Sequence, residues 1–245
     1  MHERTSVRVP LLTFDVRLTQ RLGVQAAASV PYVTRSAVVA LDTGTLNYRE
    51  SFRGLGDTSL LAWYRLKPLR GWNGVVSAGA SLPTGRAEAP RFRPELQDGS
   101  LVPVSRLQRG TGTIDPLLGL SIDKRVAFGT VFGSVAARLP LAESTHGLRT
   151  GASAEGSGGV ARELGTHRLN GFVRASWLHR QQDVFDGTPV LVGGGHWFYV
   201  TPGVAAQVGK GIQVQAEVKV PVHRALANRQ LDSRAVFQFG VSRSF

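Results

Sequence analysis

The sequence predicts an all-β protein, a transmembrane antiparallel up-and-down β-barrel. Three observations predict this fold. About eleven segments alternate apolar and polar residues at every second position, which is the period of a β-strand. Most of them run for ~10–13 residues, close to the ~9–11 that a tilted membrane-crossing strand needs and longer than the ~5–6 usual in soluble proteins. Short turns alternate with long polar segments between them, as in membrane barrels.

Composition narrows the class of protein further. Of the 245 residues, 42% are hydrophobic and 19% charged, so the chain is too apolar to be disordered. There is no cysteine, which excludes disulfide scaffolds, thiolate metal sites and cysteine nucleophiles. The net charge of +12 is spread along the chain instead of lying in one run, so we expect no nucleic-acid partner. The longest stretch without a charged residue, 187–209, contains three successive glycines and Pro202, which makes it a poor transmembrane helix.

The alternation is clearest in segment 211–222. Every even-numbered residue there is apolar, while positions 213, 215, 217 and 219 are Gln, Gln, Glu and Lys. Such a strand has one apolar and one polar face. In chain order, the expected strands are 7–20, 23–33, 54–66, 73–83, 112–124, 126–138, 150–163, 168–180, 195–208, 211–222 and 233–245.

The connections predict the topology. Turns of a few residues join some strands, and long polar segments join the others. These long segments are 34–53, 84–111, 139–149, 181–194 and 223–232. The last strand follows a long segment, so the C-terminus should lie on the short-turn, periplasmic side, whereas the first readable strand begins on the opposite side. Bacterial single-chain barrels have an even number of strands and both ends in the periplasm. The start of the chain also lacks the apolar stretch of a signal peptide. We therefore expect residues 1–245 to form a single domain that lacks its signal peptide and first strand, from a parent barrel of about twelve strands.

Polar residues within the strands should face the lumen, because Lys or Arg at the bilayer midplane costs ~2–4 kcal/mol when it faces lipid. The expected lumen residues are Asp15, Arg17, Asp57, Arg65, Asp123, Arg174, Gln213, Gln215, Glu217 and Lys219. For Asp57 two interpretations remain open. It pairs across the lumen with an arginine such as Arg65, Arg17 or Arg174, or it is an exposed aspartate at the end of a loop.

Aromatic residues gather near the expected strand ends, where membrane barrels carry girdles at the headgroup level. The expected girdle residues are Tyr32, Trp63, Tyr64, Trp72, Trp177 and Trp197. The last strand alternates apolar residues and ends in Phe, which resembles the C-terminal signal read by barrel-assembly machinery. The residues of this signal are Phe237, Phe239, Val241 and Phe245, and Arg243 departs from the pattern.

Short motifs add a family resemblance. Residues 54–60 read Gly-Leu-Gly-Asp-Thr-Ser-Leu and lead to Tyr-Arg-Leu, residues 80–85 read Ala-Ser-Leu-Pro-Thr-Gly, and residues 30–32 read Val-Pro-Tyr. In this order they resemble the outer-membrane family named for the meta-pathway of phenol degradation, over most of the chain from about residue 9. The resemblance implies a barrel that is often described as a transporter of hydrophobic or aromatic compounds, and it implies no catalytic residues.

Motifs for enzyme chemistry are absent from the sequence. There is no P-loop, no His-Glu-x-x-His and no Gly-x-Ser-x-Gly, and none of the six histidines is paired at a metal-ligand spacing. We expect no enzyme activity, no cofactor and no metal. The enzymatic alternative is a wall-borne hydrolase that uses Ser176 with His179 or His223.

The function expected is an outer-membrane channel or transporter for small solutes, hydrophobic or aromatic compounds among them. Expected partners are outer-membrane lipid, lipopolysaccharide, the assembly machinery and the solute. The arginines of 84–111 would bind lipopolysaccharide phosphates, line an inward constriction, or lie in a solvated loop. The alternatives are a structural or surface-interaction barrel without transport and a soluble all-β binding domain.

Overall fold

A computed structural model describes residues 2–41, 44–86, 91–92, 101–102, 110–145, 147–165, 168–189, 194–209, 211–226 and 235–243. Its main feature is an eleven-stranded antiparallel sheet with the order β19-β18-β17-β14-β13-β11-β10-β7-β6-β3-β2. Apart from small pieces outside this sheet, each strand pairs with its neighbours in the chain. The expected all-β, antiparallel, up-and-down barrel fold is therefore confirmed.

The eleven strands of the wall match the expected segments to within a few residues at most ends. Their bounds are β2 (Leu11–Arg17), β3 (Leu22–Ser29), β6 (Thr58–Arg65), β7 (Trp72–Leu82), β10 (Asp115–Val126), β11 (Gly129–Arg138), β13 (Ser153–Glu163), β14 (Leu169–Arg180), β17 (Gly195–Gly209), β18 (Ile212–Leu226) and β19 (Val236–Arg243). Short turns join β2 to β3, β6 to β7, β10 to β11, β13 to β14 and β17 to β18, all at one end of the sheet.

The expectation of a long loop over 34–53 is wrong. β4 (Tyr32–Leu41) and β5 (Gly44–Arg53) form a hairpin there, and β1 (His2–Arg8) pairs with β4 to make a three-stranded sheet. The same two chain segments also supply β2 and β3, and the register runs on unbroken: Arg8 opposes Tyr32 and Leu11 opposes Ser29. The interruption falls at Pro10 and Pro31, which have no backbone N–H to donate to a sheet. One long ribbon thus begins beyond the wall and continues into it.

Small strand pairs also lie within other segments that were expected to be irregular. They are β8 (Arg91–Phe92) with β9 (Leu101–Val102), and β15 (Val184–Phe185) with both β12 (Leu148–Arg149) and β16 (Thr188–Pro189). Within the described residues, no helix has the length and apolar character needed to cross a membrane.

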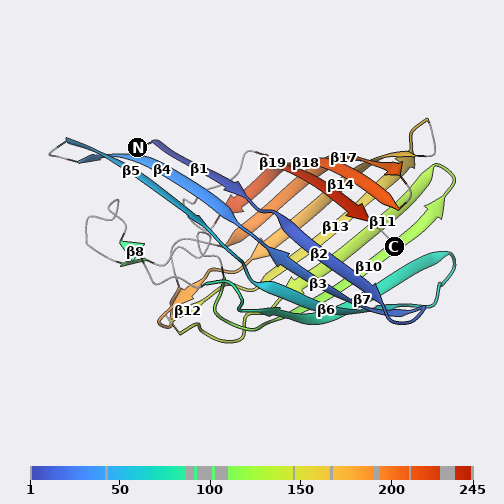
Figure 1. Cartoon of the computed structure of the whole chain (residues 1–245), viewed down its shortest axis with the longest axis horizontal. Coiled ribbons are helices and arrows are strands. Elements are labelled where there is room, and N and C mark those ends of the chain that lie inside the picture. Colours follow the sequence, from blue (N-terminus) through green and yellow to red (C-terminus); the bar gives the residue numbers. More distant parts are fainter. Residues whose placement is uncertain are drawn as a thin grey trace.

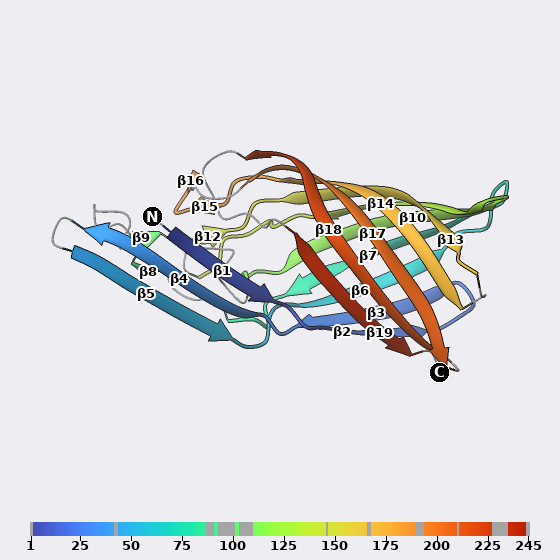
Figure 2. The same cartoon turned by 90° about the horizontal axis from the view of Figure 1, so that it is seen from above.

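The sheet curls until its edge strands, β2 and β19, face each other (Figures 1 and 2). The ribbon of β1, β4 and β5 projects beyond the long-loop end, where the N-terminus lies, while the C-terminus lies at the short-turn end (Figure 1). This arrangement creates a concave inner face and a convex outer face.

Burial separates the two faces of the wall. Along β17, Trp197, Tyr199 and Thr201 are buried, whereas the intervening Phe198 and Val200 are exposed. The outer face carries many large apolar side chains, up to Phe237, which is 80% exposed. A soluble protein rarely exposes so continuous an apolar surface.

Candidate functional site

The inner face of the wall carries a group of ion pairs that connects β13, β14 and β18 across β17. The Arg174 Nη2 atom on β14 donates to Glu217 Oε1 on β18 at 2.8 Å, across β17. The Lys219 Nζ atom on β18 lies 3.3 Å from Glu155 Oε1 on β13, with β14 and β17 between them. Strands are ~4.8 Å apart, so side chains three strands apart meet only where the wall is concave. We call Glu155, Arg174, Glu217 and Lys219 the wall ion cluster.

Hydroxyl and aromatic groups lie close to the wall ion cluster. The Lys219 Nζ atom lies 4.3 Å from the ring centroid of Tyr199, a cation–π contact. Gln215 donates to Glu217 Oε2 at 3.1 Å. The Ser176 and Thr201 hydroxyls are buried and have no hydrogen-bond partner among the described residues. Buried hydroxyls are normally paired, so these two are exceptions among the described residues.

A second cluster holds the ends of the long 84–111 segment. The carboxylate of Asp57, at the start of β6, accepts from the backbone N–H of Gly85 at 3.2 Å and of Thr111 at 2.8 Å. Arg138 at the end of β11 lies 3.6 Å from Asp57 Oδ2 and donates from Nε to Asp115 Oδ2 at 2.9 Å. Asp115 is fully buried and also accepts from the Thr113 hydroxyl at 2.7 Å. We call this group the loop clasp.

The loop clasp corrects the expectation for Asp57. Its cationic partner is Arg138, not Arg65, Arg17 or Arg174. The pairing was missed because alternation identifies faces but not the register that places β11 near β6. A smaller cluster of the same kind lies near the start of β13 and the end of β14. There Asp183 accepts from Arg180 Nη2 at 2.8 Å and from the Gly151 N–H at 2.7 Å.

Several aromatic rings on the inner face occupy the space over glycines of the next strand. A Cβ added at Gly23 would lie 2.2 Å from Trp63 Cζ2, and one added at Gly203 would lie 2.2 Å from Phe172 Cζ. Phe132 covers Gly159 in the same way. Such rings shield the backbone at glycine positions. They also line the short-turn half of the inner wall with apolar surface.

Two of the expected girdle residues point inward, which corrects that expectation. Trp63 donates from Nε1 to Asp15 Oδ2 at 3.1 Å, on the inner face. Trp197 is only 3% exposed and lies on the same face as Tyr199. The signal was present in the sequence, because Trp63 lies two positions from Arg65, which was expected to face the lumen, and Trp197 lies four positions from the polar Thr201 on the same strand.

The other expected girdle residues are on the outside of the molecule or partly covered. Tyr32 and Tyr64 are each 43% exposed, and Trp72 lies beneath Lys124, whose Nζ is 5.7 Å from the ring. Trp177 is half-buried on the outer face, stacked with His179 and His196.

The remaining expected residues are placed as follows. Asp123 accepts from Asn73 Nδ2 at 2.8 Å on the inner face. Arg17, Arg65 and Gln213 are exposed near the short turns. Phe237, Phe239 and Val241 are exposed on the outer face of β19, whereas Phe245 lies outside the described residues.

The hydrolase alternative fails on geometry. Ser176 opposes Tyr199 on the inner face, whereas His179 opposes His196 and His223 opposes Phe198, all on the outer face. The wall separates the serine from both histidines, so neither pair can act together.

The short-turn end of the wall is strongly basic. Ten described Lys and Arg residues lie in the short turns, at the adjoining end of β19, or within four residues of these, against three acids there, Asp15, Asp123 and Glu163. We call the ten bases the basic rim: Arg17, Arg21, Arg65, Lys67, Arg70, Lys124, Arg125, Arg162, Arg168 and Arg243. The described residues of this end therefore contribute a net +7, against the formal +12 of the whole chain.

Comparison with known proteins finds similarity in fold. No protein-family model matches the chain, and no curated protein matches it. Among solved structures, the COG4313 outer membrane channel from Pseudomonas putida F1 has a similar fold, with a TM-score of 0.67 at 12% sequence identity. The match covers 98% of this chain and 82% of that one.

Proposed function

We propose that this chain is an outer-membrane β-barrel through which small solutes pass. The observation that carries the proposal is the two-sided wall, in which part-exposed ion pairs and buried hydroxyls occupy the concave face and large apolar side chains cover the convex face. An apolar exterior of this kind suits lipid, and a polar interior suits a water-accessible path. The fold shared with an outer membrane channel supports the same conclusion.

The solutes we favour are small hydrophobic or aromatic compounds. Support comes from the inner rings of Trp63, Phe132 and Phe172, which form apolar surface along the short-turn half of the wall. The sequence motifs that resemble the phenol meta-pathway family agree with this class of solute.

Conductance and uptake test this function. The protein is purified from the outer-membrane fraction, checked for heat-modifiable gel mobility and reconstituted into planar bilayers. We expect discrete single-channel events and faster uptake of a small aromatic probe, such as phenol or benzoate, into proteoliposomes than into empty vesicles. A heat-modifiable barrel that gives neither conductance nor uptake would contradict transport.

The alternative, a surface-interaction barrel without transport, is favoured by the ribbon of β1, β4 and β5 that projects beyond the long-loop end (Figure 1). Shortening the β4–β5 hairpin distinguishes the two functions. The alternative would be supported if the wild-type protein shows no solute permeability and the shortened variant loses binding to cells or surfaces.

A further inference from the structure

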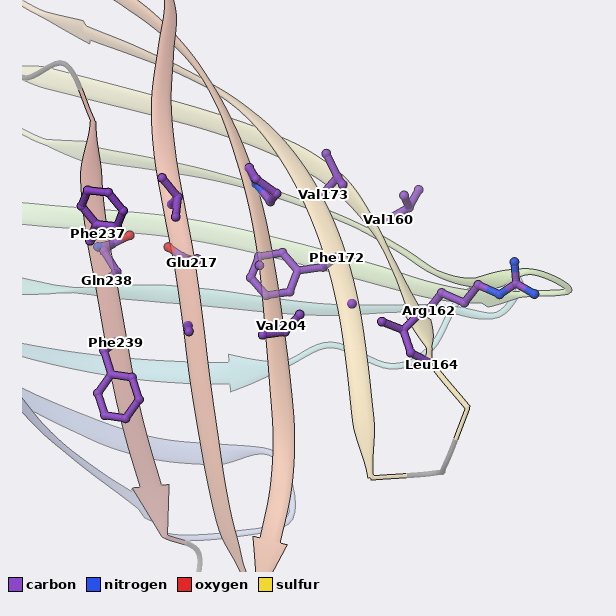
Figure 3. A pocket seen from close by; sticks show the side chains of 15 residues that line it. Val160, Arg162, Leu164, Phe172, Val173, Val204, Glu217, Phe237, Gln238 and Phe239 are labelled. Atoms are coloured by element: carbon purple, nitrogen blue, oxygen red, sulfur yellow. The ribbon is translucent and has the colours of Figure 1, made fainter.

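The outer face of the wall holds an apolar groove that ends at an arginine. The groove has a volume of about 860 Å³ and crosses β13, β14, β17, β18 and β19. Leu164, Val173, Val204, Phe237 and Phe239 are among the side chains that line it. Figure 3 shows Arg162 extending away from the wall beside Leu164, at one end of this lining.

Strand register shows that Arg162 and Lys124 both point outward. Lys124 opposes Trp72 on β7 and Val131 on β11, and Val131 in turn opposes Val160 on β13. Arg162 is two residues beyond Val160 on the same strand and therefore on the same face. The two cations lie two strands apart, which is ~10 Å along the sheet. Arg162 has no ion-pair partner among the described residues.

These features together match the chemistry of an anionic phospholipid. Outward-facing Lys and Arg at the ends of membrane strands reach the headgroup level and bind phosphate. The basic rim surrounds them with net positive charge, which favours an anionic over a zwitterionic lipid. The groove beside Arg162 offers apolar surface that an acyl chain would cover. A free phosphate ion would leave this surface uncovered.

We propose that Arg162 and Lys124 bind the phosphodiester of an anionic phospholipid in the leaflet on the short-turn side, with one acyl chain in the groove. This inference rests on the proposed membrane location. The bound lipid would cover the outer face over β13 to β19, where Phe237 and Phe239 are most exposed.

The test is lipid preference measured on the intact protein in vesicles. The protein is reconstituted into phosphatidylcholine that contains brominated phosphatidylglycerol or brominated phosphatidylcholine, and quenching of tryptophan fluorescence reports lipid at the wall. Trp72 lies against Lys124 and is the reporter, so the Trp72→Phe variant supplies the background from the other tryptophans. We expect wild-type protein to prefer phosphatidylglycerol. We expect K124Q/R162Q to lower that preference roughly thirtyfold, about 2 kcal/mol for two cations near a membrane surface.

A matched variant controls for net charge alone. R86Q/R149Q removes two exposed arginines from the long-loop side and should leave the preference unchanged. An equal loss in both double variants, or no preference in the wild type, overturns the proposal.

A third variant tests the groove. Val204→Trp fills it without removing a charge, and it should reduce the number of lipids retained in native mass spectrometry. Unchanged retention overturns the acyl-chain part of the proposal. Failure of the wild-type protein to enter vesicles would contradict the membrane barrel itself, whereas insertion and conductance without lipid preference would overturn only the lipid site.

Discussion

At the scale of single residues, Asp115 and Arg138 dominate the long-loop end of the wall. Asp115 has no exposed surface, and its carboxylate accepts from both the Arg138 guanidinium and the Thr113 hydroxyl. A buried ion pair contributes little relative to an apolar pair, but removing one partner leaves an uncompensated charge. Further interactions of Arg138, with Asp57 and Thr111, connect this pair to both ends of the 84–111 segment.

Asp115→Asn should therefore lower the free energy of unfolding by about 1–3 kcal/mol, because a buried charge-assisted hydrogen bond is lost while Arg138 keeps Asp57 as a partner. Urea unfolding in detergent, followed by heat-modifiable gel mobility, measures the change. Asp123→Asn is the control, since Asp123 bonds Asn73 in an exposed position. Equal stability of the two variants would contradict the assigned burial.

The glycines beneath aromatic rings give a second prediction at this scale. Gly203→Ala places a methyl group where the Phe172 ring now lies, so the ring must swing into the lumen. We expect a lower single-channel conductance and normal assembly, with conductance restored by adding Phe172→Ala. Gly240→Ala is the matched control, because a Cβ there meets nothing within 4 Å. A reduction of similar size in the control would rule out ring displacement as the cause.

At the scale of the strand, the face on which a residue lies decides which substitutions are tolerated. On β19, Phe239 opposes Ala216 on the outer face, while its neighbour Gln238 opposes Glu217 on the inner face. The same new side chain therefore lies on the convex outer face at one position and on the concave inner face at the next.

Phe239→Arg should destabilise the barrel by about 2–4 kcal/mol if it lies near the bilayer midplane, whereas Gln238→Arg should cost much less because Glu217 lies opposite. Unfolding from lipid vesicles in urea compares the two. If the arginine at 238 were the costlier one, the faces of β19 would be reversed.

Alternation of apolar and polar residues predicts only those strands that have one apolar and one polar face. It predicted β18 and its inner Gln215, Glu217 and Lys219, because a strand between lipid and water must alternate. It did not predict β4 and β5, because they lie beyond the wall and the apolar run 37–41 has no period of two.

The up-and-down order of the strands was predicted, but the register between neighbouring strands was not. Arg138 and Asp115 meet through register, which depends on the geometry of turns and loops and not on the composition of either strand. Trp63 and Trp197, by contrast, were misplaced although their positions relative to Arg65 and Thr201 predict the inner face. For both residues, strand periodicity predicts the inner face correctly, whereas aromatic character near a strand end wrongly predicts a girdle position.

At the scale of the whole molecule, the short turns and the long loops define two ends of different charge and different size. The basic rim lies at one end, and the loop clasp and the projecting ribbon lie at the other (Figure 1). In an outer membrane, the short turns face the periplasm and the long loops face the outside.

Single introduced cysteines test this orientation, because the sequence itself contains no cysteine that could be labelled. Thr188→Cys on the long-loop side should react with a membrane-impermeant maleimide in intact cells, whereas Gln20→Cys in a short turn should react only after the cells are lysed. Labelling of position 20 alone in intact cells would mean that the barrel is inserted the other way round.

The rings that lie over glycines limit how the width of the barrel interior can be changed by substitution. At Gly23 and at Gly203 the strand has no side chain, and an aromatic ring of the neighbouring strand, Trp63 or Phe172, covers the glycine backbone. Enlarging the glycine alone crowds the passage, and shrinking the aromatic alone leaves bare main chain exposed to water. Width and chemistry of the passage can therefore be tuned only by exchanging both members of a pair at once, so libraries that vary one site at a time would miss most of the permissible diameters.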